Sequence, residues 1–197
     1  MTSSRGIALE HGCYYHIYNR RINGTPLYYA PVNYTHFLKL YNKYISPIAD
    51  TYAWNSMGNH SHLLVRIEEE NEIIINTLPN PTRVNASKSI NPPHIYFSHL
   101  FNSYKQVINK QQHRTALLFE RPFHRLKVTS GKYFLNLVSY LHQNPFHHGN
   151  TMLTGITLGH RMVILYSISQ QGLIGKPYRR GLVERRILLM FIGKLLN

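Results

Sequence analysis

Residues 59–65, Asn-His-Ser-His-Leu-Leu-Val, constrain the fold of this chain more than any other stretch. The apolar, β-prone residues at its end predict a buried strand that continues to position 67. Side chains alternate along a strand, so His60 and His62 should project side by side from one face and Ser61 from the other. Two imidazoles in this arrangement can begin a metal site or can simply be solvated, and a third ligand and a reactive group are needed to decide.

The residues before the histidines predict a strand, a helix and a second strand. Residues 13–21 are rich in aromatic side chains and predict the first strand. Apolar residues recur every three or four positions from 37 to 45, which predicts a helix that Asn33 caps and Pro47 ends. Residues 51–57 predict a strand that turns through residues 58–59 into the histidine strand. Strand, helix, strand, strand is the first half of a ferredoxin-like layer.

The second half of the chain predicts two more helices, with a strand between them. Residues 71–93 hold four prolines and predict a long connection, and residues 94–111 predict a helix. The alternation at the end of residues 117–128 suits a strand. Residues 132–144 have a helical pattern that we expect Pro145 to close.

The charge of the chain indicates a polyanionic partner. Its 197 residues, enough for one domain, hold 22 Lys and Arg against 8 Asp and Glu, a formal net charge of +14. Residues 101–197 carry +12 of this charge, from 14 basic and 2 acidic side chains. The basic residues stand mostly singly or in pairs and not along one amphipathic helix, which favours nucleic acid over a membrane surface.

Composition also bears on the compartment. The single cysteine, Cys13, cannot form an intrachain disulfide and fits a reducing environment. The sequence has no run of 18 apolar residues and no apolar signal region at its start. We therefore expect a cytoplasmic, nucleoid-associated protein that makes no contact with a membrane.

The helix predicted over residues 132–144 offers a reactive group and a third metal ligand. Tyr140 and Asn144 are four residues apart, so they lie about 40° apart around the helix, on one face. The Tyr140 hydroxyl can attack a phosphate of a nucleic acid and form a 5′-phosphotyrosine. The Asn144 amide can join His60 and His62 around a divalent ion.

Two alternatives stay open at the level of sequence. Tyr104 is a rival nucleophile on the other basic helix, but the residue four positions on is Ile108, and Asn109 lies about 140° around the helix. Tyr140 itself can be a core tyrosine, because apolar residues surround it in the sequence. Of the two tyrosines, we expect Tyr140 to be the nucleophile, because only Tyr140 has a suitable partner.

Basic residues near aromatic ones are candidate contacts to nucleic-acid phosphates. They occur at the end of the first predicted strand, along and just after the helix at 94–111, in the strand segment at 117–128 and near the C-terminus. The alternative is that these charges are only solvated. The candidates are Arg20, Arg21, Lys105, Lys110, Arg114, Arg121, Arg125, Lys127, Arg179 and Arg180.

Four stretches resemble one family, in the family's order. Residues 59–65 are similar to the His-hydrophobic-His strand of the HUH endonucleases. Residues 139–149, Ser-Tyr-Leu-His-Gln-Asn-Pro-Phe-His-His-Gly, resemble the tyrosine helix of the REP-associated tyrosine transposases. Residues 15–20 and 118–123 resemble that family's opening strand and the segment before its tyrosine helix. The likeness covers about residues 10–150, and four ordered motifs are more specific than a lone histidine pair.

The resemblance implies an α+β, ferredoxin-like HUH-endonuclease fold, with a central antiparallel sheet and helices packed on one face. It implies a transposase that cuts and rejoins single-stranded DNA near hairpins, with Mg²⁺ or Mn²⁺ and a 5′-phosphotyrosine intermediate. His60, His62 and Asn144 would be the metal ligands and Tyr140 the nucleophile. Such proteins occur as monomers and as homodimers.

The chain departs from that family in two places. Ser61 stands where the family has a hydrophobic residue, and residues 159–167 lack its Trp-Ser-Ser-Tyr motif. We expect residues 1–150 to form the transposase domain and residues 151–197 a diverged basic extension of it. The departures favour an alternative function, a catalytically weak, domesticated protein that binds hairpin DNA. A ferredoxin-like RNA-binding domain is a third possibility, which leaves the histidine pair unexplained.

Overall fold

The computed structural model describes residues 6–79, 82–84, 87–120, 123–148, 152–158, 161–169 and 172–174. Of residues 82–84, 87, 88 and 142–148, and of the strands that follow them, it describes the backbone alone. Within these ranges, no helix is both long enough and apolar enough to cross a bilayer.

Six elements of the chain follow the order strand, helix, strand, strand, helix, strand. The four strands pair antiparallel in the spatial order β6-β1-β3-β2. This connectivity and strand order are those of a ferredoxin-like layer, so the predicted α+β fold class is confirmed. The elements are β1 (Tyr14–Arg20), α1 (Pro31–Tyr44), β2 (Ala49–Met57), β3 (His60–Ile67), α2 (Pro93–Gln111) and β6 (His124–Lys127).

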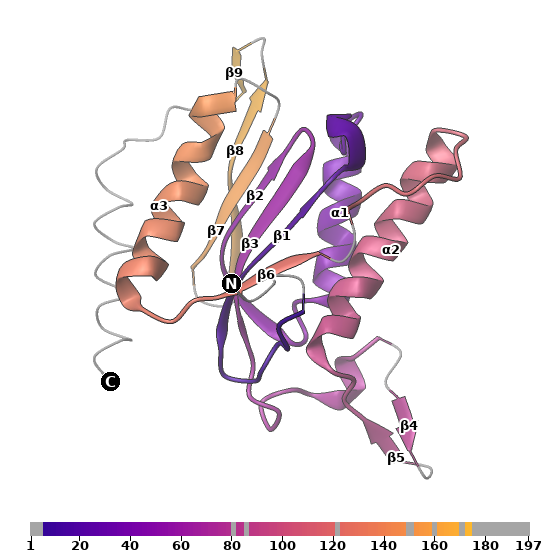
Figure 1. Ribbon diagram of the computed structural model, residues 1–197, viewed down its shortest axis with the longest axis vertical. Helices are drawn as coiled ribbons and strands as arrows, with labels where there is room; N and C mark the ends of the chain where they lie inside the picture. The colour runs from indigo at the N-terminus through magenta and orange to yellow at the C-terminus, as the bar shows by residue number, and fades with distance from the viewer. Residues whose placement is uncertain are drawn as a thin grey trace.

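A third helix and three further strands extend this layer. Helix α3 (Gly131–His148) follows β6, and β7 (Met152–Leu158) then pairs with β2. Strands β8 (Arg161–Ser169) and β9 (Gly172–Ile174) complete a seven-stranded sheet. Helices α1 and α2 lie on one face of the sheet and α3 on the other (Figure 1). The prediction of helices on one face therefore holds for α1 and α2 and is wrong for α3.

Apolar patterning explains why the helices take opposite faces. Strand β3 is apolar on both sides, because Leu63 and Val65 point toward α1 and α2 while Leu64 points toward α3. Helix α3 presents one apolar stripe at spacings of three and four residues, which must be buried against a sheet. Its stripe packs on Leu64 and consists of Phe134, Leu137, Val138 and Leu141.

Strands β2 and β3 form the predicted hairpin, with residues 58–59 as its turn. Ser61 is buried on the face opposite the histidines, as predicted, and pairs across the sheet with Ser56. The Ser56 hydroxyl accepts a hydrogen bond from the Tyr28 hydroxyl at 3.2 Å. The Ser61 hydroxyl thus lies near two other hydroxyls, those of Ser56 and Tyr28, and not among apolar side chains alone.

A long connection joins β3 to α2, as predicted for residues 71–93. It contains a 3-10 turn (Ile75–Thr77) and a small pair of strands, β4 (Thr82–Val84) and β5 (Ser87–Ser89). The predicted end of the last helix is wrong. The last helix does not close at Pro145 but continues through it, as the bounds of α3 show. Proline removes one backbone donor and bends a helix, which other contacts of the helix can offset.

We expect Leu64→Ala to lower the free energy of unfolding by about 2–5 kcal/mol, because the residue is fully buried between the sheet and α3. The matched control is Ile74→Ala, whose side chain is 66% exposed and should change the value by less than about 0.5 kcal/mol. Urea denaturation followed by circular dichroism measures both. Similar effects of the two substitutions would contradict the packing of α3 on this face.

Candidate functional site

His60 and His62 lie side by side at the start of β3, on the face that α3 covers. Their ring centroids are 4.9 Å apart, and the rings are nearly perpendicular, at 85°. Nδ1 of His60 is hydrogen-bonded to Oδ1 of Asn59, and Nδ1 of His62 to Nε2 of His16 at 2.9 Å. Because Nδ1 is engaged in both rings, Nε2 is the nitrogen that each ring would present to a metal ion.

His16 was not among the predicted site residues, yet it orients His62. It is buried on β1, directly opposite Leu64, two residue pairs along the ladder from the Tyr18–His62 pair. Alternation along β1 places His16 and Tyr18 on one face, which the sequence indicates. Only the pairing of Tyr18 with His62 shows that this is the face of the histidines.

The site continues as a row of stacked rings across three strands. The ring of Tyr18 lies 5.5 Å from that of His62 at 26°, and 4.6 Å from that of His124 on β6 at 4°. His16 stacks on His62 at 5.2 Å and 21°. Tyr18 is therefore a second tyrosine near the histidine pair, held between two rings, and sequence analysis did not single it out.

Burial keeps the inner imidazoles neutral. It lowers the pKa of His62 to about 2, with further contributions from the nearby His16 and His60. Burial likewise lowers the pKa of His16 to about 4. Since a neutral imidazole is the form that binds a metal, the site needs no deprotonation of His62 near pH 7.

Tyr140 is the predicted nucleophile, and α3 places it next to the histidines. Its ring centroid is 6.0 Å from that of His62, with the rings at 88°. Its side chain is 47% exposed, although it stands in the sequence between Val138 and Leu141 of the apolar stripe. Tyr140 is therefore not a core tyrosine.

Tyr104, the rival nucleophile, lies on the opposite face of the sheet. It is fully buried in the core beneath α1 and α2, and its hydroxyl donates to the carbonyl of Leu27 at 3.1 Å. Burial raises its pKa well above the ordinary value of a tyrosine. A phenol that is buried, hydrogen-bonded and hard to deprotonate is unsuited to attack. Of the two tyrosines, the geometry therefore favours Tyr140 as the nucleophile.

Asn144 lies on α3, one turn after Tyr140, but its side chain is outside the described residues. Among the side chains that are described, no group of three or more His, Cys, Asp or Glu can hold a metal. His60 and His62 are two imidazole donors side by side, and an amide oxygen is a suitable type of third ligand for a divalent ion.

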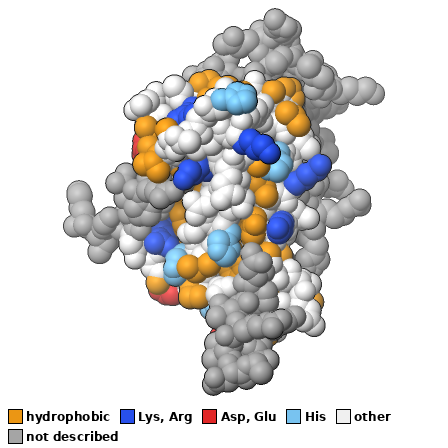
Figure 2. Space-filling view, turned by 90° about the vertical axis from the view of Figure 1, so that its right-hand side faces the viewer, with side chains coloured by type: hydrophobic (Ala, Val, Ile, Leu, Met, Phe, Trp, Pro, Cys, Tyr) orange, Lys and Arg blue, Asp and Glu red, His pale blue; other side chains and the backbone are white. Residues whose placement is uncertain are grey.

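Most of the predicted DNA-binding residues lie away from the histidine face. Lys105 and Lys110 are on α2, and Arg114 follows it. Arg125 and Lys127 pair across β1 with core residues that face α1 and α2, so they share that side of the sheet. On this side, Lys and Arg are scattered among uncharged side chains, with Asp and Glu visible only near the margin (Figure 2). Three candidates, Arg121, Arg179 and Arg180, lie outside the described residues.

Arg20 ends β1 and Arg21 follows it, beside the β2–β3 turn. Arg20 is exposed and pairs with His60, so it shares the histidine face. Arg21 is 3% exposed, its guanidinium lies 5.1 Å from the ring centroid of Tyr29, and its Nη1 is buried without a hydrogen-bond partner. Of the predicted DNA-binding residues that are described, Arg20 is thus the one placed next to the histidine pair.

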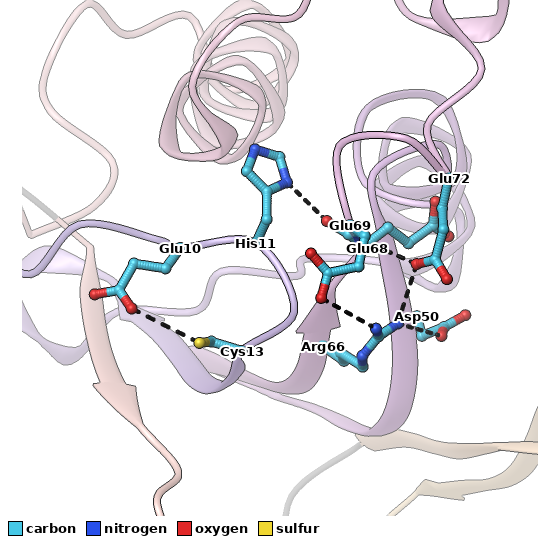
Figure 3. A network of polar contacts seen from close by, with 8 residues as sticks. All are labelled: Glu10, His11, Cys13, Asp50, Arg66, Glu68, Glu69 and Glu72. Carbon is cyan, nitrogen blue, oxygen red and sulfur yellow. Dashed lines mark hydrogen bonds and ion pairs between the residues drawn. The ribbon is translucent and has the colours of Figure 1, made fainter.

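The acidic side chains gather at the other end of the sheet. Arg66, at the end of β3, lies within 3.8 Å of Asp50 and Glu69 and 3.4 Å of Glu72 (Figure 3). Glu10 pairs with Lys127 nearby. Arg66 and His62 are four residues apart, or roughly 13 Å along a strand. Of the three consecutive glutamates at 68–70, Glu69 takes part in this ion-pair network.

Comparisons with known proteins found no matching family model and no similar curated protein. Two solved structures are similar in backbone. One is a REP-associated tyrosine transposase bound to a REP hairpin, with a TM-score of 0.47 and 14% identity over 76% of this chain and 75% of that one. The other is a bacterial tRNA(His) guanylyltransferase-like protein in complex with GTP, with a TM-score of 0.41 and 11% identity over 92% of each chain.

We expect N-acetylimidazole to acetylate Tyr140 and not Tyr104 in the folded protein, because their side chains are 47% and 0% exposed. Mass spectrometry of proteolytic peptides measures both modifications. In urea, where both phenols are accessible, the two tyrosines should react alike. Acetylation of Tyr104 in the native protein would contradict its place in the core.

Proposed function

We propose that the chain is a REP-associated tyrosine transposase of the single-tyrosine HUH type. It cuts and rejoins single-stranded DNA near hairpins, with Tyr140 as the nucleophile. The observation that carries this proposal is the exposed Tyr140 ring, 6.0 Å from the buried, neutral His62. A strand supplies the histidines and a helix on the same face supplies the tyrosine, which agrees with the order of the motifs.

The reaction is a transfer of a phosphoryl group between two oxygens. The Tyr140 oxygen attacks the phosphorus and loses its proton, a bond forms between them, and the bond from phosphorus to the 3′ oxygen breaks. The 3′ oxygen leaves and takes up a proton, while the 5′ end stays on the tyrosine. Reversal by another 3′ hydroxyl rejoins the strand, since the phosphodiester energy is kept in the covalent intermediate.

His60, His62 and Asn144 would hold Mg²⁺ or Mn²⁺ through two imidazole nitrogens and an amide oxygen. A divalent ion bound there supplies Lewis-acid polarisation of the phosphate and stabilises negative charge on the leaving oxygen. His16 orients His62 through its hydrogen bond. Tyr18 and His124 offer a flat pair of rings beside the histidines, on which an unpaired base can stack.

The charge distribution supports a single-stranded or hairpin DNA that enters from the β2–β3 turn. Arg20 lies at that end of the sheet, whereas Arg66 and its three carboxylate partners lie at the other. Phosphates are attracted to the first end and repelled by the second. This polarity directs the strand toward Tyr140 and the histidines.

We expect wild-type protein with Mn²⁺ and labelled hairpin DNA from its own genomic neighbourhood to give a covalent adduct on a denaturing gel. Tyr140→Phe should abolish this adduct, because it removes the attacking oxygen, and chelation with EDTA should abolish it as well. Tyr104→Phe is the matched control and should keep the adduct, since Tyr104 is buried on the other face.

The same experiment includes Tyr18→Phe, because Tyr18 also lies near His62. An adduct that persists in Tyr140→Phe and disappears in Tyr18→Phe would make Tyr18 the nucleophile. Tight binding of hairpins without an adduct would favour the catalytically weak DNA-binding protein. Stronger binding of RNA than of DNA of the same sequence would favour the RNA-binding domain.

We expect Arg20→Gln to reduce the slope of log affinity for hairpin DNA against log salt concentration by about 1, through loss of one phosphate contact. Arg66→Gln is the matched control on the same face of the sheet and should leave the slope unchanged, because its guanidinium already faces three carboxylates. Fluorescence anisotropy at several salt concentrations measures both. Equal slopes for the two variants would contradict entry of DNA from the β2–β3 turn.

A further inference from the structure

Asn55 is a fully buried polar residue in the middle of β2. It pairs directly with His62 on β3, so its side chain shares the face of the histidines. Its Nδ2 donates a hydrogen bond of 3.1 Å to the carbonyl of Leu141, the residue after Tyr140. One hydrogen bond therefore joins the strand beside His62 to the turn of α3 that carries Tyr140.

The Leu141 carbonyl has a particular need for this donor. In an α-helix, a carbonyl accepts from the N–H four residues on. For Leu141 that residue is Pro145, which has no N–H, although α3 continues through it. The proline leaves the Leu141 carbonyl without a donor inside the helix, and Asn55 supplies that donor from the sheet.

Apolar packing alone does not fix the position of α3 along its own axis relative to the sheet. The stripe that includes Leu137 and Leu141 selects which side of the helix faces β2 and β3, but hydrophobic contact has no preferred direction. A hydrogen bond has a preferred length and angle, so it fixes the helix along and around its axis. The Asn55 contact acts at the turn where position matters for Tyr140 and Asn144.

We propose that Asn55 is a positioning residue for Tyr140, and that Pro145 provides the free carbonyl through which it acts. This inference rests on the proposed function, since it concerns the alignment of Tyr140 with a phosphate held beside His62. Asn55 Oδ1 is buried without a hydrogen-bond partner.

The test combines Asn55→Leu with Pro145→Ala. Asn55→Leu removes the donor with little change in size, so it should lower the melting temperature and reduce the rate of adduct formation about tenfold or more, with unchanged affinity for hairpin DNA. Pro145→Ala restores the helical N–H. The double variant should therefore regain the melting temperature, because the carbonyl is satisfied, but not the rate, because the link to β2 is still missing.

Asn109→Leu is the matched control. Asn109 is also buried, donates from Nδ2 to a backbone carbonyl, that of Ala116, at 2.8 Å, and has a buried Oδ1 without a partner. It lies on α2, on the other face of the sheet. Its loss should lower the melting temperature without a change in the rate of adduct formation.

Recovery of both melting temperature and rate in the double variant would overturn the proposal, because Asn55 would then only satisfy a carbonyl. An unchanged rate in Asn55→Leu would overturn it as well. If the wild-type protein forms no adduct, the proposed function fails. The position of Tyr140 relative to His62 is then measured by NMR instead. The shift that Tyr140→Leu causes in the His62 ring signals should shrink in the Asn55→Leu protein, and a shift that stayed the same would contradict the inference.

Discussion

The position of β3 between β1 and β2 determines which strand residues surround the histidine pair. Its pairing with β1 brings His16 and Tyr18 to the histidines, and its pairing with β2 brings Asn55 there. A slip of one residue in either pairing would turn the histidines toward the α1 and α2 core. The apolar residues on both faces of β3 prevent such a slip, because it would bury imidazoles in place of leucine and valine. Packing energy thus holds the polar site in register.

The sequence predicted those parts of the fold that depend on local pattern. Alternation and the two-residue turn at 58–59 were enough for the β2–β3 hairpin, and the helical pattern of residues 132–144 was enough for α3. The order of elements then led to the ferredoxin-like layer. Tyr140 was chosen over Tyr104 because of its neighbours in the helix, and the burial of Tyr104 explains the choice physically.

Other features depend on contacts between distant segments and could not be predicted in this way. Helix α3 lies on the opposite face of the sheet because its apolar stripe packs there, on Leu64. It continues past Pro145 because Asn55, on the sheet, donates to the carbonyl that the proline leaves without a helical donor. His16 joins the site only through strand pairing. The face of the sheet that each basic residue occupies could not be predicted either, because a count of charges contains no information on it.

Helix α3 is connected at both ends to strands of the same sheet. The chain enters α3 from β6, at one edge of the sheet. After α3 it forms β7, which pairs with β2 on the side away from β3. Figure 1 shows the helix lying across this face, with strands before and after it in the same sheet. A shift of α3 would therefore strain β6 or β7, because both are its neighbours in the chain and both are hydrogen-bonded within the same sheet.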